Sequence, residues 1–139
     1  MPNTALINID KIKWMISDYK LNNDFYLKLS NKIVLDMVKR YLSNRINVII
    51  EKAFCKKENI YPFLKYANEK DAKVLIYNIE APWKIINKRL KTRKHKMTTK
   101  KGKRIYKSYS KNKFSVNKTF DTSKTTQKKI INSIISDIK

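Results

Sequence analysis

The sequence predicts an α/β fold in which parallel strands alternate with helices. Short apolar runs at residues 4–9, 48–51 and 72–79 have the length of strands. The run at 48–51 consists of β-branched residues with no polar alternation, which is typical of a strand buried on both faces of a parallel sheet. Longer segments between these runs repeat apolar residues every three or four positions, as helices do. The pattern therefore predicts a three-layer protein, in which helices cover both faces of a parallel sheet.

The first half of the chain starts with a strand expected at residues 4–9, which stops at Asp10. A short helix is expected at residues 11–18, and Asp10 is a suitable N-cap for it. Residues 25–42 predict a long amphipathic helix, because apolar side chains recur there every four residues. A turn then leads into the strand at residues 48–51.

The second half continues the alternation of helices and strands. A helix with an irregularity at Pro62 is expected at residues 56–70, and the strand at 72–79 follows it. The next helix should span residues 83–94. Residues 95–118 have almost no periodic apolar pattern and predict a mobile excursion.

The end of the chain predicts one more strand and one more helix. The strand is expected within residues 114–120, and Thr122 or Ser123 can cap the isoleucine-rich helix after it. A chain of 139 residues has the size of one domain, so we expect a single domain over residues 1–139.

The net charge of +22 is extreme, and most of the excess lies in one segment. Residues 91–118 hold 12 Lys and Arg and no acid, whereas residues 1–90 hold 17 Lys and Arg against 9 acids. A basic chain suggests nucleic-acid binding. Lys, Asn and Ile are abundant throughout, however, as they are in the products of genomes rich in A and T. The basic segment therefore needs an explanation of its own.

Composition also limits the location and the chemistry. No run approaches the ~20 apolar residues of a membrane span, and the N-terminal residues do not look like a signal peptide. The lone Cys55 excludes an internal disulfide and favours the cytoplasm, and with one His in the chain a zinc site is disfavoured. The one glycine, Gly102, leaves no Gly-rich loop that could cradle a phosphate.

Acidic residues stand where three of the predicted strands end, namely Asp10, Glu51 and Glu80. The carboxyl ends of parallel strands share one edge of a sheet, where ligands bind. Carboxylates there can hold Mg²⁺ or accept a proton from a substrate hydroxyl. Arg89 and Arg93 are one helical turn apart and can together bind phosphate oxygens. Carboxylates at one edge and arginines before a basic loop are the groups that phosphoryl transfer needs.

The chain resembles the small-molecule kinase branch of the P-loop NTPases, which includes AAA-type, zeta-toxin-like and chloramphenicol-phosphotransferase-like proteins. The matching stretches occur in the family's order, at residues 6–13, 47–54, 73–79 followed by Ala81 and Pro82, 87–93, and 121–123. The resemblance implies a P-loop kinase-like fold, with ATP and Mg²⁺ as cofactors. It also implies transfer of a phosphoryl group to a hydroxyl of a small molecule or nucleotide.

The resemblance implies a role for five individual residues. Asp10 would contact or deprotonate the acceptor hydroxyl, and Lys13 stands where the family usually has an arginine near the substrate. Glu51 would support Mg²⁺ or its bound waters. Arg89 and Arg93 would be lid arginines that close over the ATP phosphates.

The resemblance also assigns two segments near the end of the chain. Residues 94–118 would form the lid and its return. Asp121, Thr122 and Ser123 would line the nucleotide base and ribose.

The chain departs from the family in what it lacks at the start. The first strand, the Gly-rich loop with its lysine and the first helix have no counterpart in the sequence. The missing strand belongs between those expected at residues 48–51 and 73–79. We therefore expect a truncated kinase, from a truncated gene or a late start codon, that does not transfer phosphate at a useful rate.

A nucleic-acid-binding protein is the alternative. Tyr106 and Tyr109 lie among the cations of residues 94–118, and interleaved aromatic and basic residues can hold single strands. A third hypothesis is a non-catalytic remnant that pairs with another chain through its open sheet edges.

Overall fold

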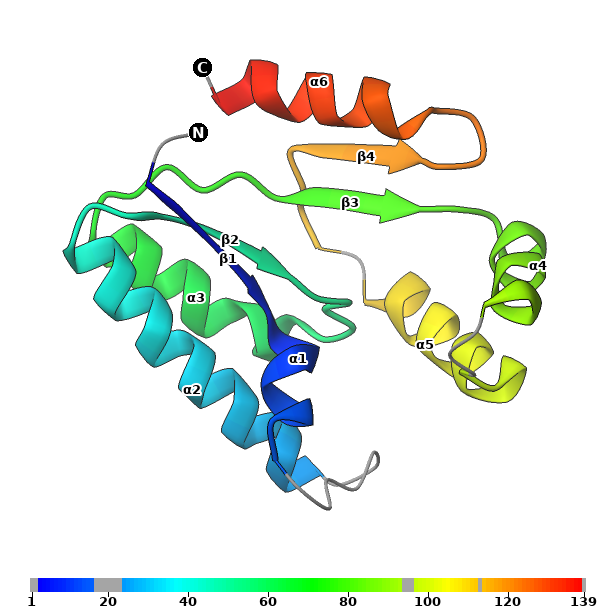
Figure 1. Ribbon diagram of the computed structural model, residues 1–139, viewed down its shortest axis with the longest axis horizontal. Helices are drawn as coiled ribbons and strands as arrows, with labels where there is room; N and C mark the ends of the chain where they lie inside the picture. The colour runs from blue at the N-terminus through cyan, green and yellow to red at the C-terminus, as the bar shows by residue number, and fades with distance from the viewer. Residues whose placement is uncertain (1–2, 17–23, 94–96, 113, 139) are drawn as a thin grey trace. The chain divides into compact units, whose positions relative to one another are not determined.

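The structure is a computed structural model, and it describes all residues except 1–2, 17–23, 94–96, 113 and 139. The chain folds as two compact units, Met1–Val74 and Leu75–Lys139 (Figure 1). Each contains one pair of parallel strands with helices packed beside them. The predicted α/β class with parallel strands is therefore confirmed.

The described residues of the first unit form two strands and three helices. In chain order they are β1 (Thr4–Asn8), α1 (Ile9–Trp14), α2 (Asp24–Ser43), β2 (Asn47–Glu51) and α3 (Lys57–Glu69). Strands β1 and β2 pair in parallel, in a register that runs from Thr4 opposite Asn47 to Asn8 opposite Glu51. The two strands thus end side by side, as the sequence predicts for parallel neighbours.

The core of the first unit forms where α1, α2 and α3 meet the strands. Its buried members are Ile7, Ile9, Val34, Val38 and Phe63. Two of them lie one turn apart on α2, as the apolar stripe of that helix predicts. Partly buried side chains of β2 pack against the same cluster, which joins sheet and helices into one apolar interior.

Strand β2 differs from its prediction in burial. Val48 and Ile50 face the core, whereas Ile49 on the other face is 44% exposed. Leu6, the register partner of Ile49 on β1, is 71% exposed. Among the described residues the core thus covers one face of this strand pair, and the expectation of burial on both faces was wrong.

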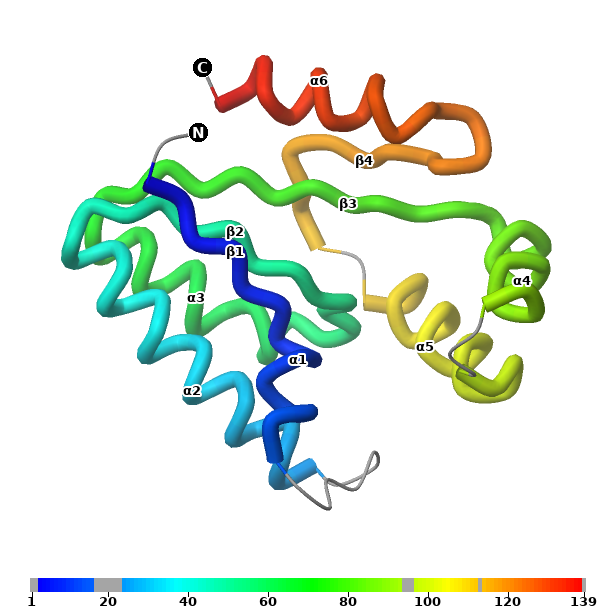
Figure 2. Tube along the Cα trace, viewed as in Figure 1, coloured from blue at the N-terminus to red at the C-terminus, as the bar shows by residue number. Residues whose placement is uncertain are grey.

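In the second unit, too, the part of the chain that the structure describes forms two strands and three helices. They are β3 (Tyr77–Glu80), α4 (Trp83–Thr92), α5 (Thr99–Lys111), β4 (Lys118–Asp121) and α6 (Gln127–Ile138), and Figure 2 traces the chain through them. Strands β3 and β4 pair in parallel, from Tyr77 opposite Lys118 to Glu80 opposite Asp121. The carboxyl ends of these strands also lie side by side.

Helix α5 corrects the predicted mobile excursion, since residues 99–111 are helical. The helix packs on α4 through Gly102, whose missing side chain allows a close approach. A Cβ atom at this position would lie 2.6 Å from Cδ1 of Leu90. The rings of Trp83 and Tyr106 also meet, with centroids 5.6 Å apart. The apolar pattern was missed because glycine and tyrosine, rather than aliphatic residues, form the packed face.

Helix ends and one strand differ from their predictions too. The side chain of Asn8, and not that of Asp10, caps α1, and the predicted end of this helix at residue 18 lies outside the described residues. Thr126 rather than Thr122 or Ser123 precedes α6, and its hydroxyl accepts a hydrogen bond from the backbone N–H of Lys129 at 3.4 Å. The strand predicted at residues 72–79 starts only at Tyr77.

Candidate functional site

The ends of β1 and β2 carry a fixed pair of polar side chains. The amide nitrogen of Asn8 donates to Oε2 of Glu51 at 3.0 Å, and Oδ1 of Asn8 accepts from the backbone N–H of Lys11 at 3.0 Å. One side chain thus caps α1 and orients a carboxylate of the neighbouring strand. Glu51 stands exposed at the carboxyl end of its strand, where the sequence predicts it.

Asp10 and Lys13 lie together on α1. They form an ion pair within one turn of this helix. The side chain of Lys13 is only 13% exposed, whereas that of Asp10 is 47% exposed. Burial therefore fixes the ammonium more firmly than the carboxylate, which stays open on one side.

Lys52, the residue after Glu51, was not predicted as a site residue. Its ammonium donates to Oδ1 of Asn31 on α2 at 3.1 Å. Burial, reinforced by the nearby charge of Lys13, lowers the pKa of Lys52 to about 8, although the charges of Asp10 and Cys55 oppose that shift. The sequence signal was slight, a lysine directly after a predicted site carboxylate.

Cys55 lies close to this group. Burial raises the pKa of the Cys55 thiol, and the positive charge of Lys52 partly offsets the rise. The thiol is therefore not an activated nucleophile.

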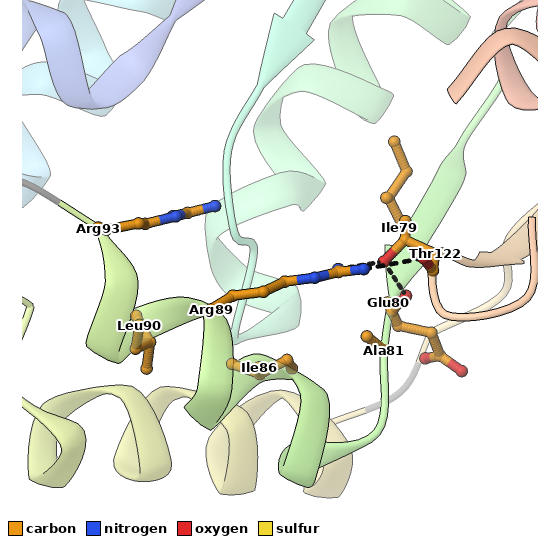
Figure 3. Close-up of a pocket in the computed structure, with 8 residues that line it drawn as sticks. All are labelled: Ile79, Glu80, Ala81, Ile86, Arg89, Leu90, Arg93 and Thr122. Atoms are coloured by element: carbon orange, nitrogen blue, oxygen red, sulfur yellow. Dashed lines mark hydrogen bonds between the residues drawn. The ribbon is translucent and has the colours of Figure 1, made fainter. Parts of the chain in front are cut away.

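The second unit contains an open pocket of about 310 Å³ at the carboxyl ends of its strands (Figure 3). The lining residues come from the end of β3, from α4 and from the turn after β4: Ile79, Glu80, Ala81, Ile86, Arg89, Leu90, Arg93 and Thr122. Four of the eight lining residues are apolar, and the other four contribute two guanidinium groups, one carboxylate and one hydroxyl. Half of the lining is therefore polar or charged.

Arg89 is held at the edge of this pocket. Its guanidinium donates to the hydroxyl of Thr122 at 2.7 Å and to the carbonyl oxygen of the same residue at 2.9 Å. The Thr122 hydroxyl donates in turn to the carbonyl oxygen of Glu80 at 3.1 Å. The arginine is therefore fixed by both strand ends.

Arg93, the residue directly after the last turn of α4, extends into the same pocket (Figure 3). No residue that the structure describes gives its guanidinium a hydrogen bond or an ion pair. Five N–H donors of a charged group thus remain available at the pocket. The two arginines predicted to bind phosphate oxygens together thus line one pocket.

Only the middle one of the three residues predicted to line the base and ribose reaches this pocket. Oδ1 of Asp121 accepts from the backbone N–H of Ser123 at 2.8 Å and from its hydroxyl at 2.6 Å. These two hydrogen bonds lower the pKa of Asp121. The side chain of Glu80 is likewise engaged, as it accepts from the Asn78 amide at 2.8 Å.

Metal sites and membrane-spanning helices can also be assessed for the described residues. Among the described residues, no group of three or more His, Cys, Asp or Glu side chains is placed to hold a metal ion. Within that same part of the chain, no helix combines the length and the apolar character that crossing a membrane requires.

Comparison with known proteins identifies the family. No curated protein matches the chain. A tunicamycin resistance protein of Deinococcus radiodurans has a similar structure, with a TM-score of 0.59 at 9% sequence identity, over 99% of this chain and 82% of that one. At so low an identity the similarity shows the fold alone. The sequence profile of the AAA domain matches residues 3–110, which is more than half of the chain. The chain therefore belongs to the AAA domain family of P-loop NTPases and has a P-loop kinase-like fold.

Proposed function

We propose that this chain carries the acceptor-side and lid elements of an ATP-dependent phosphotransferase that acts on a hydroxyl of a small molecule or nucleotide. The observation that carries the proposal is the arginine pair in the pocket of the second unit. A pair of lid arginines can neutralise the charge of a transferred phosphoryl group when one arginine is held in place and the other has a free guanidinium. Arg89 supplies the fixed member, and Arg93 supplies the free one.

The first unit supports the proposal with its strand-end carboxylates. Asp10 is partly exposed beside Lys13, so it can accept a proton from an acceptor hydroxyl while the ammonium stabilises its charge. Glu51 uses one carboxylate oxygen for the Asn8 amide and keeps the other for a water molecule or a cation. One carboxylate fits Mg²⁺ that arrives with nucleotide phosphates, since this ion usually keeps several waters. Bound in that way, the ion neutralises phosphate charge.

We further propose that these 139 residues alone transfer no phosphoryl group at a useful rate. Gly102, the one glycine, is buried in the contact of α5 with α4 and cannot belong to a phosphate loop. Without such a loop, no run of backbone N–H groups cradles the β-phosphate and no loop lysine reaches the γ-phosphate.

The test compares two proteins in ATP titrations monitored by calorimetry. One is the chain as printed, and the other adds the codons that lie upstream in frame in the genome. We expect little binding to the first and clear binding to the second, provided that the added segment encodes a strand, GxxxxGK[ST] and a helix. An upstream region with its own ribosome site and no such segment would contradict the truncation hypothesis. In the extended protein, Glu51→Gln should abolish most of the turnover, and unchanged turnover would remove Glu51 from the mechanism.

Nucleic-acid binding remains a second candidate because of the exposed face of α5. Five cations spaced along one side of this helix are exposed: Lys100, Lys103, Arg104, Lys107 and Lys111. The packing of Tyr106 on Trp83 argues against base stacking by that ring, so binding would rest on phosphate contacts. Electrophoretic retardation of single-stranded RNA and DNA should then weaken steeply as salt rises. Absence of retardation at low salt would exclude this candidate.

A further inference from the structure

A small group of basic and amide side chains in the first unit surrounds Lys52. Lys52 is the residue directly after β2, and its ammonium donates to Oδ1 of Asn31 on α2 at 3.1 Å. The amide nitrogen of Asn31 lies 3.5 Å from Oδ1 of Asn59, so the Asn31 oxygen is turned toward the lysine. Lys52 is thus held by a neutral acceptor, and two of its three N–H donors have no partner among the described residues.

The charges of this group do not balance. Two ammonium groups, those of Lys13 and Lys52, stand against the single carboxylate of Asp10, which pairs with Lys13. The carboxylate of Glu51, the residue before Lys52, accepts a hydrogen bond from the Asn8 amide and is not among the charges that shift the pKa of Lys52. A half-buried excess of one positive charge is costly unless an anion joins it.

The lowered pKa of Lys52 is consistent with the same imbalance. The titratable groups that face it are Lys13 and Asp10 from α1 and Cys55 from the segment after β2, while α2 contributes the neutral Asn31. Burial and the Lys13 charge outweigh the two opposing groups, so that its pKa is lowered to about 8. An anion bound beside both ammonium groups would remove the reason for this shift.

We propose that Lys13 and Lys52, the latter held in place by the Asn31 oxygen, form a binding site for the carboxylate or phosphate monoester of a small anionic molecule. Ammonium groups act as point charges with freely rotating donors, so they suit a tetrahedral or a planar oxyanion equally well. The half-exposed carboxylate of Asp10 leaves the group open to solvent on one side. The identification of this molecule as the phosphoryl acceptor rests on the proposed function, whereas the anion site itself does not.

The experiment measures the reactivity of individual lysines with acetic anhydride by mass spectrometry, across a pH series. Only the neutral amine reacts, so Lys52 should titrate near pH 8, and the exposed Lys11 of the same helix region serves as the internal reference. Inorganic phosphate or acetate is then added at constant ionic strength, with chloride as the balancing salt. Binding should raise the pKa of Lys52, and a rise of one unit slows its acetylation about fivefold at pH 8. The rate for Lys11 should not change.

Variants distinguish a specific anion site from a general screening of charges by the added salt. Lys13→Met should raise the pKa of Lys52 in the absence of ligand, because a repelling charge is removed, and should abolish protection by the anion. The matched control Lys11→Met should leave both properties unchanged. If Lys13→Met fails to fold, Asn31→Ala takes its place and should also reduce protection, since the Lys52 ammonium loses the acceptor that holds it in place.

Each outcome decides a point. Protection by phosphate alone assigns the site to phosphate monoesters, protection by acetate alone to carboxylates, and protection by both to either group. Absence of protection, equal slowing of Lys11 and Lys52, or full protection in folded Lys13→Met would overturn the proposal. The measurement uses no nucleotide and no turnover, so a failure of the proposed phosphotransferase function would leave its result intact.

Discussion

Asn8 and Glu51 are register partners at the carboxyl ends of β1 and β2, and the amide of one donates to the carboxylate of the other at 3.0 Å. The same amide group caps α1 through its oxygen. The residue that ends the first strand therefore both starts the next helix and orients the carboxylate of the neighbouring strand. The stability of the fold and the orientation of the Glu51 carboxylate should thus both depend on the Asn8 side chain.

Replacement of Asn8 by Ala should lower the free energy of unfolding by about 1 kcal/mol, because the helix loses its cap. Asn8→Asp keeps a cap oxygen but places a second carboxylate beside Glu51. We expect that variant to be less stable at neutral pH than at pH 4, where protonation relieves the repulsion. Urea unfolding at both pH values checks the two expectations. Equal stability of Asn8→Ala and the parent chain would show that the cap contributes nothing.

The contact of α4 with α5 predicts that Gly102→Ala lowers the stability of the parent chain but raises the stability of a Leu90→Ala variant. Gly102→Ala gains about 1 kcal/mol of helix propensity but places a Cβ atom 2.6 Å from Cδ1 of Leu90. We expect the clash to outweigh the gain, so the single variant is less stable than the parent.

In the Leu90→Ala background the clash is absent, and Gly102→Ala should then stabilise by about 1 kcal/mol. Thermal unfolding of the four proteins measures the coupling. Lys103→Ala, at the exposed position next to Gly102, is the control and should change stability little. Equal effects of Gly102→Ala in both backgrounds would contradict the packing of the two helices.

The sequence predicted those elements whose signal is local. The apolar stripe of α2 repeats within one helix, and its buried Val34 and Val38 follow from that spacing. Asp10 and Lys13 lie three residues apart, so their meeting on one helix face needs no tertiary information. Arg89 and Arg93 were predicted to act together for the same reason.

Features that depend on distant partners were missed. Asn8 is 43 positions from Glu51, and only the register of β1 with β2 brings them together. The partner of Lys52 lies on a helix 21 positions earlier, so neither its burial nor its pKa can be deduced from neighbours in sequence. Helix α5 escaped detection because its packed face is built on Gly102, which most patterns treat as a breaker.

Thr122 anchors the fixed arginine of the pocket, so its hydroxyl can be tested separately from its shape. Thr122→Val keeps the β-branched volume but removes one acceptor of Arg89 and one donor to Glu80. We expect a loss of about 1 kcal/mol in unfolding free energy and faster rotation of the Arg89 guanidinium in NMR spectra. Thr119→Val, at an exposed position of β4, is the matched control. An unchanged guanidinium in Thr122→Val would show that the backbone carbonyl alone holds the arginine.

Asp121 should give a stability change at acidic pH. Hydrogen bonds from Ser123 lower the pKa of its carboxyl in the folded chain. The stabilisation is therefore present above the unfolded-state pKa of about 3.9 and is lost as pH falls through the lower folded-state value. Ser123→Ala should reduce this acid sensitivity, whereas Ser110→Ala, on α5, should not. NMR titration of the carboxyl in the parent and the two variants measures the pKa itself. An unshifted Asp121 pKa in the parent chain would disprove the expectation.

Lys52 should give a further stability change, of the same sign, at alkaline pH. Its pKa is lowered to about 8 in the folded chain, against about 10.4 when unfolded, so the unfolded state binds more protons between these values. The stability of the fold should therefore rise with pH from about 8 to about 10.4, and the penalty for the charged amine is complete below pH 8.

Lys52→Met removes that penalty, so it should stabilise the chain at pH 7 and show less increase at higher pH than the parent. Lys56→Met, at a nearby exposed position, corrects for other groups that titrate in the same range. Denaturant unfolding at pH 7, 8.5 and 10 measures the difference between the two variants. If both variants follow the same curve, the ammonium of Lys52 is not destabilised by its surroundings. The charge imbalance inferred for the Lys13–Lys52 group would then be compensated in the free protein, and the reason for an anion to bind there would disappear.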